Sequence, residues 1–299
     1  MGMKYKISVV IPNYNGLELL QKNLPSVIAE TKKYDESAEI IVVDDASSDG
    51  SVSYIKRNFP KVKLLKHSKN RGFSSAVNSG VKISKGDLLV FLNTDVSPKE
   101  NYLINITKHF LDKNVFAVSF HEEGYGWARG YFRDGFIGHE TGGEGEVPHL
   151  SFWVNGGSGV FRKKYFRELG GFDAKLYDPF YWEDVDISYR AMKRGYRVLW
   201  EPEAKVIHKH ESTMVKINKR KRNVIMERNQ LLFIWKNITS KNLMKKHVAG
   251  LFKRLSKHPG YIKVVFSALC KLKTVRRERK KEYKESKVSD EVIFASFNY

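Results

Sequence analysis

The sequence predicts an α/β protein with a mostly parallel central sheet, helices on both faces of the sheet and a basic helical C-terminal extension. Three observations support this prediction. Buried-strand runs alternate with helical segments over the first two thirds of the 299 residues. Polar residues follow several of these runs, at the points where strands would end. Almost all of the net charge of +20 lies in the last third of the chain.

The expected elements of the first two thirds follow one another in a regular order. Runs that are apolar on both faces are typical of parallel strands covered by helices, and they fall at residues 6–11, 39–43, 62–65 and 87–92. Helices are expected between them, near residues 17–31, 51–58 and 74–81. Residues 119–146 are rich in Gly, acidic and aromatic residues without a clear period, so we expect a connection or a mobile loop there.

Composition narrows the class of protein and its compartment. With 41% hydrophobic residues, the chain does not read as disordered. Its single cysteine, Cys270, excludes an internal disulfide and fits a reducing compartment. The apolar run at the start is cut off by Pro12 and Asn13, too soon for a signal peptide or a membrane span, and Lys6 does not fit an N-myristoylation pattern. We therefore expect a cytoplasmic protein.

Charge divides the chain into two parts. Residues 1–204 hold 28 Lys and Arg against 26 Asp and Glu, a net charge of +2. Residues 205–299 hold 25 against 7, a net charge of +18. We therefore expect a nearly neutral domain over residues 1–215 and a basic amphipathic helical region over residues 216–299.

Three polar clusters follow the expected strands. They are Asn13 with Asn15, Asp44 with Asp45, and Asn93 with Asp95. In open α/β sheets, ligands bind outside the carboxyl ends of the strands. Turn preference explains any one cluster equally well, but three clusters in phase favour a ligand site.

Two of these clusters carry carboxylates with distinct chemistry. Asp44 and Asp45 can accept hydrogen bonds from a nucleobase imide or from ribose hydroxyls. Asp95 follows the most apolar strand and can bind Mg²⁺ or Mn²⁺, which prefer oxygen ligands and bridge to substrate phosphates. The alternative for Asp95 is a turn or a helix cap ahead of Pro98.

A third group of carboxylates lies at the start of a predicted helix that ends at Gly195. Glu183 and Asp184 stand in its first turn, directly after Tyr181 and Trp182. The two aromatic rings can form a wall on which a sugar stacks, and a carboxylate at a rigid helix start is well placed as a general base. Stabilisation of the helix dipole by acidic residues is the alternative.

Two further features lie between and beyond these groups. Gly156 and Gly157 offer main-chain N–H groups for the close approach of a phosphate or a sugar. The segment lacks the lysine and the spacing of a P-loop, and no dinucleotide fingerprint follows the first strand, which disfavours ATPases and dinucleotide-binding proteins. His208 follows the last predicted strand and is either a metal or phosphate ligand or a structural histidine.

Together these motifs resemble a known family. The matching segments are SVVIPNYNG (8–16), VVDDASSDGS (42–51), NRGFSSAVNSG (70–80), GDLLVFLNTDV (86–96), NGGSGVFRKKYFRELGGFD (155–173) and WEDVDISYRAMKRGY (182–196). They resemble the family-2 inverting glycosyltransferases of the GT-A fold, and most of all a rhamnosyltransferase-like branch. The resemblance covers roughly residues 6–213, so it makes the domain over residues 1–215 the catalytic domain.

The resemblance implies a role for each matched residue. Asp184 would be the catalytic base, with Glu183 beside it, and Tyr181 and Trp182 would contact the acceptor or the sugar. The metal, Mg²⁺ or Mn²⁺, would be bound by Asp95, Asn93 and His208. Asn93 stands where the family has the first carboxylate of its D-x-D motif, which leaves Asp95 as the main anionic ligand. The donor-binding set would be Pro12, Asn13, Asn15, Asp44, Asp45, Asn70, Gly72, Asn78, Asn93, Gly156 and Gly157.

The resemblance also implies a reaction. The enzyme would move a sugar, with inversion, from a UDP- or dTDP-linked donor to a hydroxyl of a lipid-linked or growing cell-surface glycan. Asp184 would take the proton of that hydroxyl. A non-catalytic scaffold of the same fold that binds sugar nucleotides or polysaccharide is the alternative.

The basic region carries two apolar stripes. One comprises Met244, Val248, Leu251, Phe252 and Leu255, and the other Tyr261, Val264, Val265, Ala268, Leu269, Leu272 and Val275, with Pro259 and Gly260 between them. Such helices can lie on an anionic membrane surface, which would place the protein on the inner face of the cell membrane. They can equally pack on the catalytic domain. Nucleic acid is disfavoured as a partner because no recognised binding motif is present.

Overall fold

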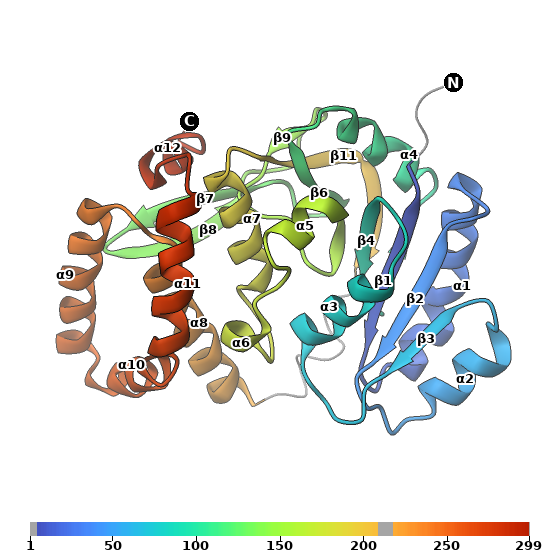
Figure 1. The fold of residues 1–299 in the computed structure, drawn as a ribbon, viewed down its shortest axis with the longest axis horizontal. Helices are drawn as coiled ribbons and strands as arrows, with labels where there is room; N and C mark the ends of the chain where they lie inside the picture. Colours follow the sequence, from blue (N-terminus) through green and yellow to red (C-terminus); the bar gives the residue numbers. More distant parts are fainter. Residues whose placement is uncertain (1–4, 209–217, 299) are drawn as a thin grey trace.

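The structure is a computed structural model that describes residues 5–208 and 218–298. It confirms the α/β class. In the described part of the chain, a nine-stranded sheet lies between helices, with the strand order β3-β2-β1-β4-β10-β6-β11-β5 and β9 paired to β11 (Figure 1). The strands are β1 (Ile7–Asn13), β2 (Glu39–Asp44), β3 (Lys63–Lys66), β4 (Leu88–Leu92), β5 (Val96–Pro98), β6 (Val115–Glu122), β9 (His149–Leu150), β10 (Ser158–Arg162) and β11 (Arg197–His208).

The four strands β3, β2, β1 and β4 form the parallel half of this sheet. Their carboxyl ends therefore meet at one edge, and the register places Asn13 opposite Asp44 there. Beyond β4 the sheet is mixed, because β10 runs antiparallel between β4 and β6, while β11 is parallel to β6. The antiparallel β10 brings the Gly156–Gly157 turn beside the end of β4.

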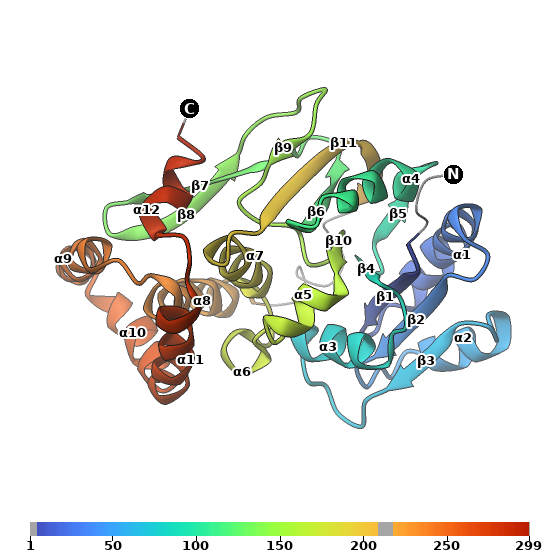
Figure 2. The ribbon, with the colours of Figure 1, turned by 45° about the horizontal axis from the view of Figure 1, so that its top comes forward.

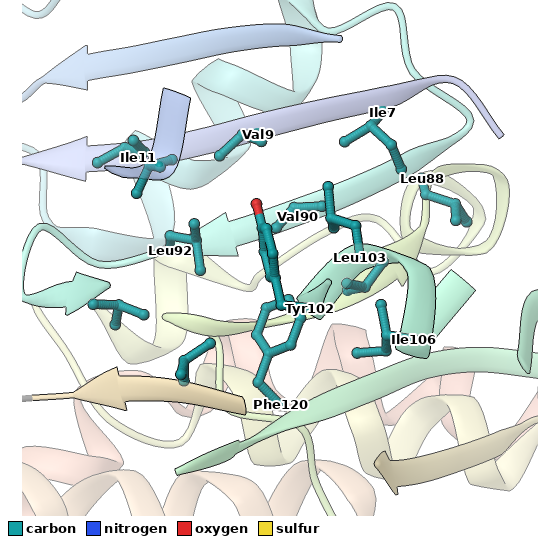
Figure 3. Packing of buried hydrophobic residues seen from close by; sticks show 14 of the residues in the cluster. Ile7, Val9, Ile11, Leu88, Val90, Leu92, Tyr102, Leu103, Ile106 and Phe120 are labelled. Carbon is teal, nitrogen blue, oxygen red and sulfur yellow. The ribbon is translucent and has the colours of Figure 1, made fainter. Parts of the chain in front are cut away.

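Helices cover both faces of the sheet, as predicted. The part of the chain before residue 209 contains α1 (Leu17–Tyr34), α2 (Ser51–Asn58), α3 (Phe73–Ile83), α4 (Tyr102–Thr107), α5 (Lys163–Glu168), α6 (Ala174–Tyr177) and α7 (Glu183–Lys193). The predicted helices near residues 17–31, 51–58 and 74–81 are confirmed. Figure 3 shows one core layer, in which Tyr102, Leu103 and Ile106 of α4 lie against apolar side chains of β1 and β4. The Tyr102 hydroxyl is satisfied by Thr31 Oγ1 at 2.9 Å.

The expectation of a connection or mobile loop over residues 119–146 is wrong for much of that segment. Its first residues belong to β6, and an antiparallel hairpin, β7 (Ala128–Arg133) and β8 (Phe136–Thr141), follows. Asp134 and Gly135 make its turn with φ of 51° and 82°. An Asp-Gly pair between strands is a strong hairpin signal, because both turn residues need positive φ. The hairpin also packs on helices distant in sequence, since His247 Nδ1 lies 2.8 Å from the Gly135 carbonyl oxygen.

The predicted helical C-terminal region is confirmed. It contains α8 (Lys219–Asn237), α9 (Lys241–Lys257), α10 (Ile262–Leu269), α11 (Leu272–Glu285) and α12 (Asp290–Ala295), which gather at one end of the molecule in both views (Figures 1 and 2). No helix in the described ranges combines the length and hydropathy needed to cross a membrane. The predicted domain boundary between residues 215 and 216 lies outside the described residues.

The second apolar stripe forms two helices instead of one, because the chain turns between α10 and α11 at Cys270 and Lys271. Val264, Val265 and Ala268 of this stripe are buried, as the packing alternative predicts. They join a hydrophobic cluster that also contains side chains of α7, α8 and the β7–β8 hairpin. The C-terminal helices therefore share a core with the part of the chain that carries the predicted base.

Candidate active site

The ends of β1 and β2 are tied together by side chains of the first polar clusters. Asn13 Nδ2 donates to Asp44 Oδ1 at 2.9 Å and lies 3.1 Å from Ser47 Oγ. The Ser47 main-chain N–H donates to Asp44 Oδ2 at 3.1 Å. Asn15 has a φ of 49°, and its Oδ1 accepts from the Ser48 N–H at 2.8 Å. Asp44 thus fixes the conformation of the turn at the ends of β1 and β2 through hydrogen bonds within the protein.

Asp45 is the anchor of the loop that joins β3 to α3. Its carboxylate accepts the N–H groups of Arg71 at 2.9 Å and Gly72 at 2.8 Å, and lies 2.6 Å from His67 Nδ1. Gly72 has a φ of +87°, and a Cβ there would come within 2.9 Å of Asp178. The second predicted nucleoside ligand is therefore buried and holds a loop in place.

A second corner of the site joins Asp95 to His208. Asp95 Oδ1 lies 3.2 Å from His208 Nε2, and Glu122 Oε1 lies 3.0 Å from His208 Nδ1. Burial alone would lower the pKa of His208, but the hydrogen bonds to Asp95 and Glu122 outweigh it and raise the pKa to about 9. Sequence reasoning did not identify Glu122, because its segment was expected to be a loop.

This corner suits a divalent cation. One carboxylate and one imidazole are appropriate ligands for Mn²⁺, provided that His208 Nε2 gives up its proton when the metal binds. Glu122 contacts the other nitrogen of the ring, as carboxylates behind metal-binding histidines do. The described ranges contain no group of three or more His, Cys, Asp or Glu side chains placed to bind one metal ion by themselves. Two protein ligands are nonetheless enough where substrate phosphates supply the others, as they usually do for Mg²⁺. The residues present therefore fit a metal shared with a diphosphate.

The glycine turn before β10 connects this corner to the predicted base. The Asn93 N–H donates to the Gly157 carbonyl at 2.7 Å, and a Cβ at Gly157 would overlap the Asn93 side chain. The Gly156 N–H donates to Asp184 Oδ2 at 3.2 Å, and the Gly157 N–H donates to Asn155 Oδ1 at 2.9 Å. The expectation that these two N–H groups are available to a phosphate is therefore corrected. Their carboxylate and amide partners already use them.

Asp184 and Glu183 stand in different electrostatic states. Burial raises the pKa of Asp184 to about 6, and N–H groups of Gly156 and Val185 limit the rise. Burial, reinforced by the neighbouring Asp184, raises the pKa of Glu183 well above its usual range. Within the described residues, Glu183 Oε2 is buried without a hydrogen-bond partner. Because its pKa is about 6, Asp184 is ionised at neutral pH and is the better base of the two, while the raised pKa of Glu183 favours its protonated form.

The turn that leads into α7 is strained. Tyr181 and Trp182 have φ of 70° and 78°, in the left-handed region that residues other than glycine rarely adopt. The Trp182 ring lies 5.3 Å from the buried Phe233 ring and 6.3 Å from the ring of His139, centroid to centroid. His139 in turn lies 5.4 Å from Trp153. Trp182 therefore belongs to a group of rings that includes His139 and Trp153, which sequence reasoning did not identify. The stacking of a sugar on Tyr181 and Trp182 stays a prediction.

A residue of helix α8 makes hydrogen bonds to this strained turn. The fully buried Asn229 donates through Nδ2 to the carbonyls of Tyr181 at 2.9 Å and Phe180 at 3.0 Å. One turn further into α7, Asp186 is 3.0 Å from Lys236 Nζ and accepts from Asn237 Nδ2 at 2.8 Å. The helix that carries the predicted base is thus anchored by residues of the basic region, an arrangement that no local sequence pattern indicated.

Some residues of the predicted donor-binding set have their polar atoms hydrogen-bonded within the protein. Asn78 uses both atoms of its amide on the main chain of Phe172, at 2.7 and 3.0 Å. We therefore assign Asn78 a structural role. Pro12 lies within β1 opposite Val43, and Asn70 is exposed in the loop before α3. Their roles, like those of the other site residues, stay predictions.

Known proteins with similar sequences are glycosyltransferases. The chain is 28% identical over 218 residues to the pre-mycofactocin glycosyltransferase of Mycobacterium tuberculosis, an alignment that covers 70% of this chain and 43% of that protein. It is 36% identical over 94 residues to the poly(ribitol-phosphate) beta-glucosyltransferase of Bacillus spizizenii, covering 30% of this chain and 15% of that protein. The chain therefore spans less than half the length of these curated relatives.

Solved structures confirm the GT-A fold, and a family profile shows the family. GalNAc-T7, crystallised with UDP, GalNAc and Mn²⁺, has a TM-score of 0.64 at 21% identity, over 87% of this chain and 57% of that chain. The mannosyltransferase PcManGT from Pyrobaculum calidifontis, solved with GDP-Man and Mn²⁺, has a TM-score of 0.59 at 17% identity, over 98% and 86%. The rhamnosyltransferase-like branch stays a prediction. The family profile for Glycosyl transferase family 2 matches residues 8–170, which is more than half of the sequence, and the chain belongs to that family.

Proposed function

We propose that this chain is an inverting, metal-dependent glycosyltransferase that moves a sugar from a nucleoside diphosphate to an acceptor hydroxyl. A UDP- or dTDP-linked sugar is the proposed donor, and a lipid-linked or growing cell-surface glycan is the proposed acceptor. Asp95, Asn93 and His208 would hold Mg²⁺ or Mn²⁺. The relative named as a poly(ribitol-phosphate) beta-glucosyltransferase and the structural neighbours solved with UDP or GDP-Man and Mn²⁺ support this assignment.

One observation carries the proposal. A single turn joins the corner formed by Asp95 and His208, called the metal corner below, to the proposed base. In this turn Gly157 accepts a hydrogen bond from the Asn93 N–H, and the adjacent Gly156 donates one to Asp184. Asp184 has a pKa of about 6, so it is ionised at neutral pH and close to the value at which a general base works best. A donor diphosphate at Asp95 and an acceptor hydroxyl at Asp184 would then lie on opposite sides of the reacting carbon.

The reaction is a single displacement. Asp184 takes the proton of the acceptor hydroxyl as its oxygen forms a bond to the anomeric carbon. The bond from that carbon to the diphosphate oxygen breaks, and the nucleotide leaves with the electron pair. A metal held by Asp95, Asn93 and His208 would neutralise charge on the leaving diphosphate. Attack opposite the leaving group inverts the configuration, and no enzyme nucleophile is needed.

Thermal stabilisation by a panel of nucleotide sugars, with and without Mn²⁺, tests the donor site. We expect one donor to stabilise the wild type only with the metal, and Asp95→Ala to lose this shift. With that donor, release of nucleotide should require Asp184, so Asp184→Asn should bind the donor normally but release nucleotide at least about 100-fold more slowly. Donor binding without any release of nucleotide in the wild type, or full activity in Asp184→Asn, would instead support the scaffold alternative.

A further inference from the structure

Helices α9 and α10 carry five exposed large apolar side chains. Phe252 is 70% exposed and Phe266 is 62% exposed. Single exposed apolar residues are common on proteins, but a group of them marks an interaction site. We name this group the α9–α10 apolar surface; it comprises Val248, Phe252, Ile262, Phe266 and Leu269.

The fold of α10 does not require these side chains. Val264, Val265 and Ala268 already fill its buried side, and they belong to the cluster shared with α8. Ile262, Phe266 and Leu269 recur at helical spacing on the other side and stay exposed. A helix with a separate buried face gains no stability from a second apolar face that water covers. The exposed face is therefore available for contact with something outside the chain.

The stretch of sequence that contains this surface carries positively charged residues and no acidic ones. Residues 228–277 contain no Asp or Glu, but they contain 13 Lys and Arg. Lys253, Lys257 and Lys263 are exposed among the apolar residues. Exposed phenylalanines flanked by lysines suit the boundary between lipid headgroups and acyl chains, where rings enter the apolar layer and ammonium groups meet lipid phosphates. A nucleic acid would use the cations but leave the aliphatic stripe of α10 in water.

We propose that the α9–α10 apolar surface docks on an anionic lipid bilayer, with Phe252 and Phe266 as its two inserting side chains. Both views place α9 and α10 at one end of the molecule, with α1 and α2 at the other (Figures 1 and 2). The proposal gives a location to the membrane contact that the basic sequence predicted. It does not depend on the proposed reaction, because binding to lipid can be measured without a donor or an acceptor.

Sedimentation with lipid vesicles tests the proposal on the full chain. We expect the wild type to sediment with vesicles of equal parts phosphatidylcholine and phosphatidylglycerol, and to stay in solution with phosphatidylcholine alone. Phe252→Ser combined with Phe266→Ser should weaken partition at least about 10-fold, since each ring loses its apolar contact. Binding should also fall at high ionic strength, because the lysines contribute by charge.

A matched variant controls for the loss of apolar surface as such. Ile104 and Leu111 are exposed to a similar degree, at 53% and 60%, but lie in the segment around α4. Ile104→Ser combined with Leu111→Ser should bind the anionic vesicles like the wild type, and both double variants should melt like the wild type. Equal vesicle binding by both double variants would overturn the proposal. So would a wild-type dimer, seen by light scattering, that the Phe252 and Phe266 changes dissociate while no vesicle binding is found.

Discussion

The side-chain amide of Asn229 donates a 2.9 Å hydrogen bond to the main-chain carbonyl of Tyr181, two residues before the carboxylates of α7. Tyr181 is held at a φ of 70° at this point. Asn229→Ala should release the turn and misplace Asp184, because nothing local favours the left-handed conformation. We expect kcat to fall by about 10- to 100-fold with little change in the KM of the donor. Steady-state kinetics with the donor identified by thermal stabilisation gives both values.

Asn105→Ala is the control for the loss of a side-chain amide. Asn105 also donates to a carbonyl, that of Glu203 at 2.9 Å, but at an exposed position away from α7. Its replacement should leave kcat unchanged. Should Asn229→Ala raise the KM of the donor and spare kcat, the turn would belong to donor binding and the positioning role would be wrong.

The contrast between Glu183 and Asp184 predicts a pH profile. Asp184 must be ionised to act as a base, so the rate should fall as pH drops through about 6, the raised pKa of this group. Burial, reinforced by the neighbouring Asp184, raises the pKa of Glu183 well above its usual range, which favours the protonated form of this group. Glu183→Gln keeps the shape and the neutral charge of the native group. We therefore expect it to retain activity within about 10-fold, with the same acidic limb of the profile.

The profile of kcat against pH for the wild type and Glu183→Gln decides between the two carboxylates. If Glu183→Gln abolishes turnover while Asp184→Asn does not, the roles are reversed. If the acidic limb of Glu183→Gln moves down by a unit or more, the coupling between the two groups, and not burial alone, sets the pKa of Asp184.

Much of the parallel half of the sheet and its polar edge was predictable from the sequence. Strands such as Leu88–Leu92 are apolar on both faces, and Asn93 and Asp95 follow directly, so local pattern and tertiary environment agree. The β7–β8 hairpin was not predicted, although Asp134 and Gly135 carry a turn signal. Its strands have few buried residues in alternation, and part of their support comes from α9 and α12, far along the chain.

In the candidate site, too, some residues could be predicted from the sequence and others could not. Its anionic residues were identifiable because each follows a strand or opens a helix in a recognisable motif. Glu122 and Asn229 were not, because their contributions exist only after folding brings β6 to His208 and α8 to α7. Helix α8 reads as a basic segment in sequence, whereas in the structure Asn229 and Lys236 on it are buried partners of the catalytic part. A role that depends on distant contacts leaves no periodic signal in a single sequence.

The buried network around Asp186 predicts a large effect on stability. Burial alone would raise the pKa of Asp186, but Arg190 and Lys236 lower it to about 2. Lys236→Met would leave the buried carboxylate of Asp186 and the partly buried one of Asp173 without this cation, which should reduce the free energy of unfolding by about 3–5 kcal/mol. Arg197→Ala, which breaks an exposed pair with Asp112, should cost at most about 1 kcal/mol. Denaturant unfolding of both variants at neutral pH gives these values.

The same network predicts that the stability of the protein falls as pH drops below about 4. A carboxylate whose pKa is depressed by folding stabilises the protein fully above its unfolded pKa, about 4 for Asp, and loses that contribution as pH falls through the folded value of about 2. The wild type should therefore lose this stability between those two values. Lys236→Met should show a smaller slope in that range. Equal slopes for the two proteins would mean that Lys236 does not depress the pKa of Asp186.

Gly157→Ala tests the turn that joins the metal corner to the base. A Cβ at this position would overlap the Asn93 side chain, so the turn or Asn93 has to move. We expect Mn²⁺-dependent donor binding to weaken at least about 10-fold, because the Asn93–Gly157 hydrogen bond and the end of β4 shift together. Gly260→Ala is the control, since a Cβ there meets nothing within 4 Å. Calorimetric titration of both variants with donor and Mn²⁺ measures the difference; unchanged binding by Gly157→Ala at unchanged melting temperature would show that the metal corner does not depend on this turn.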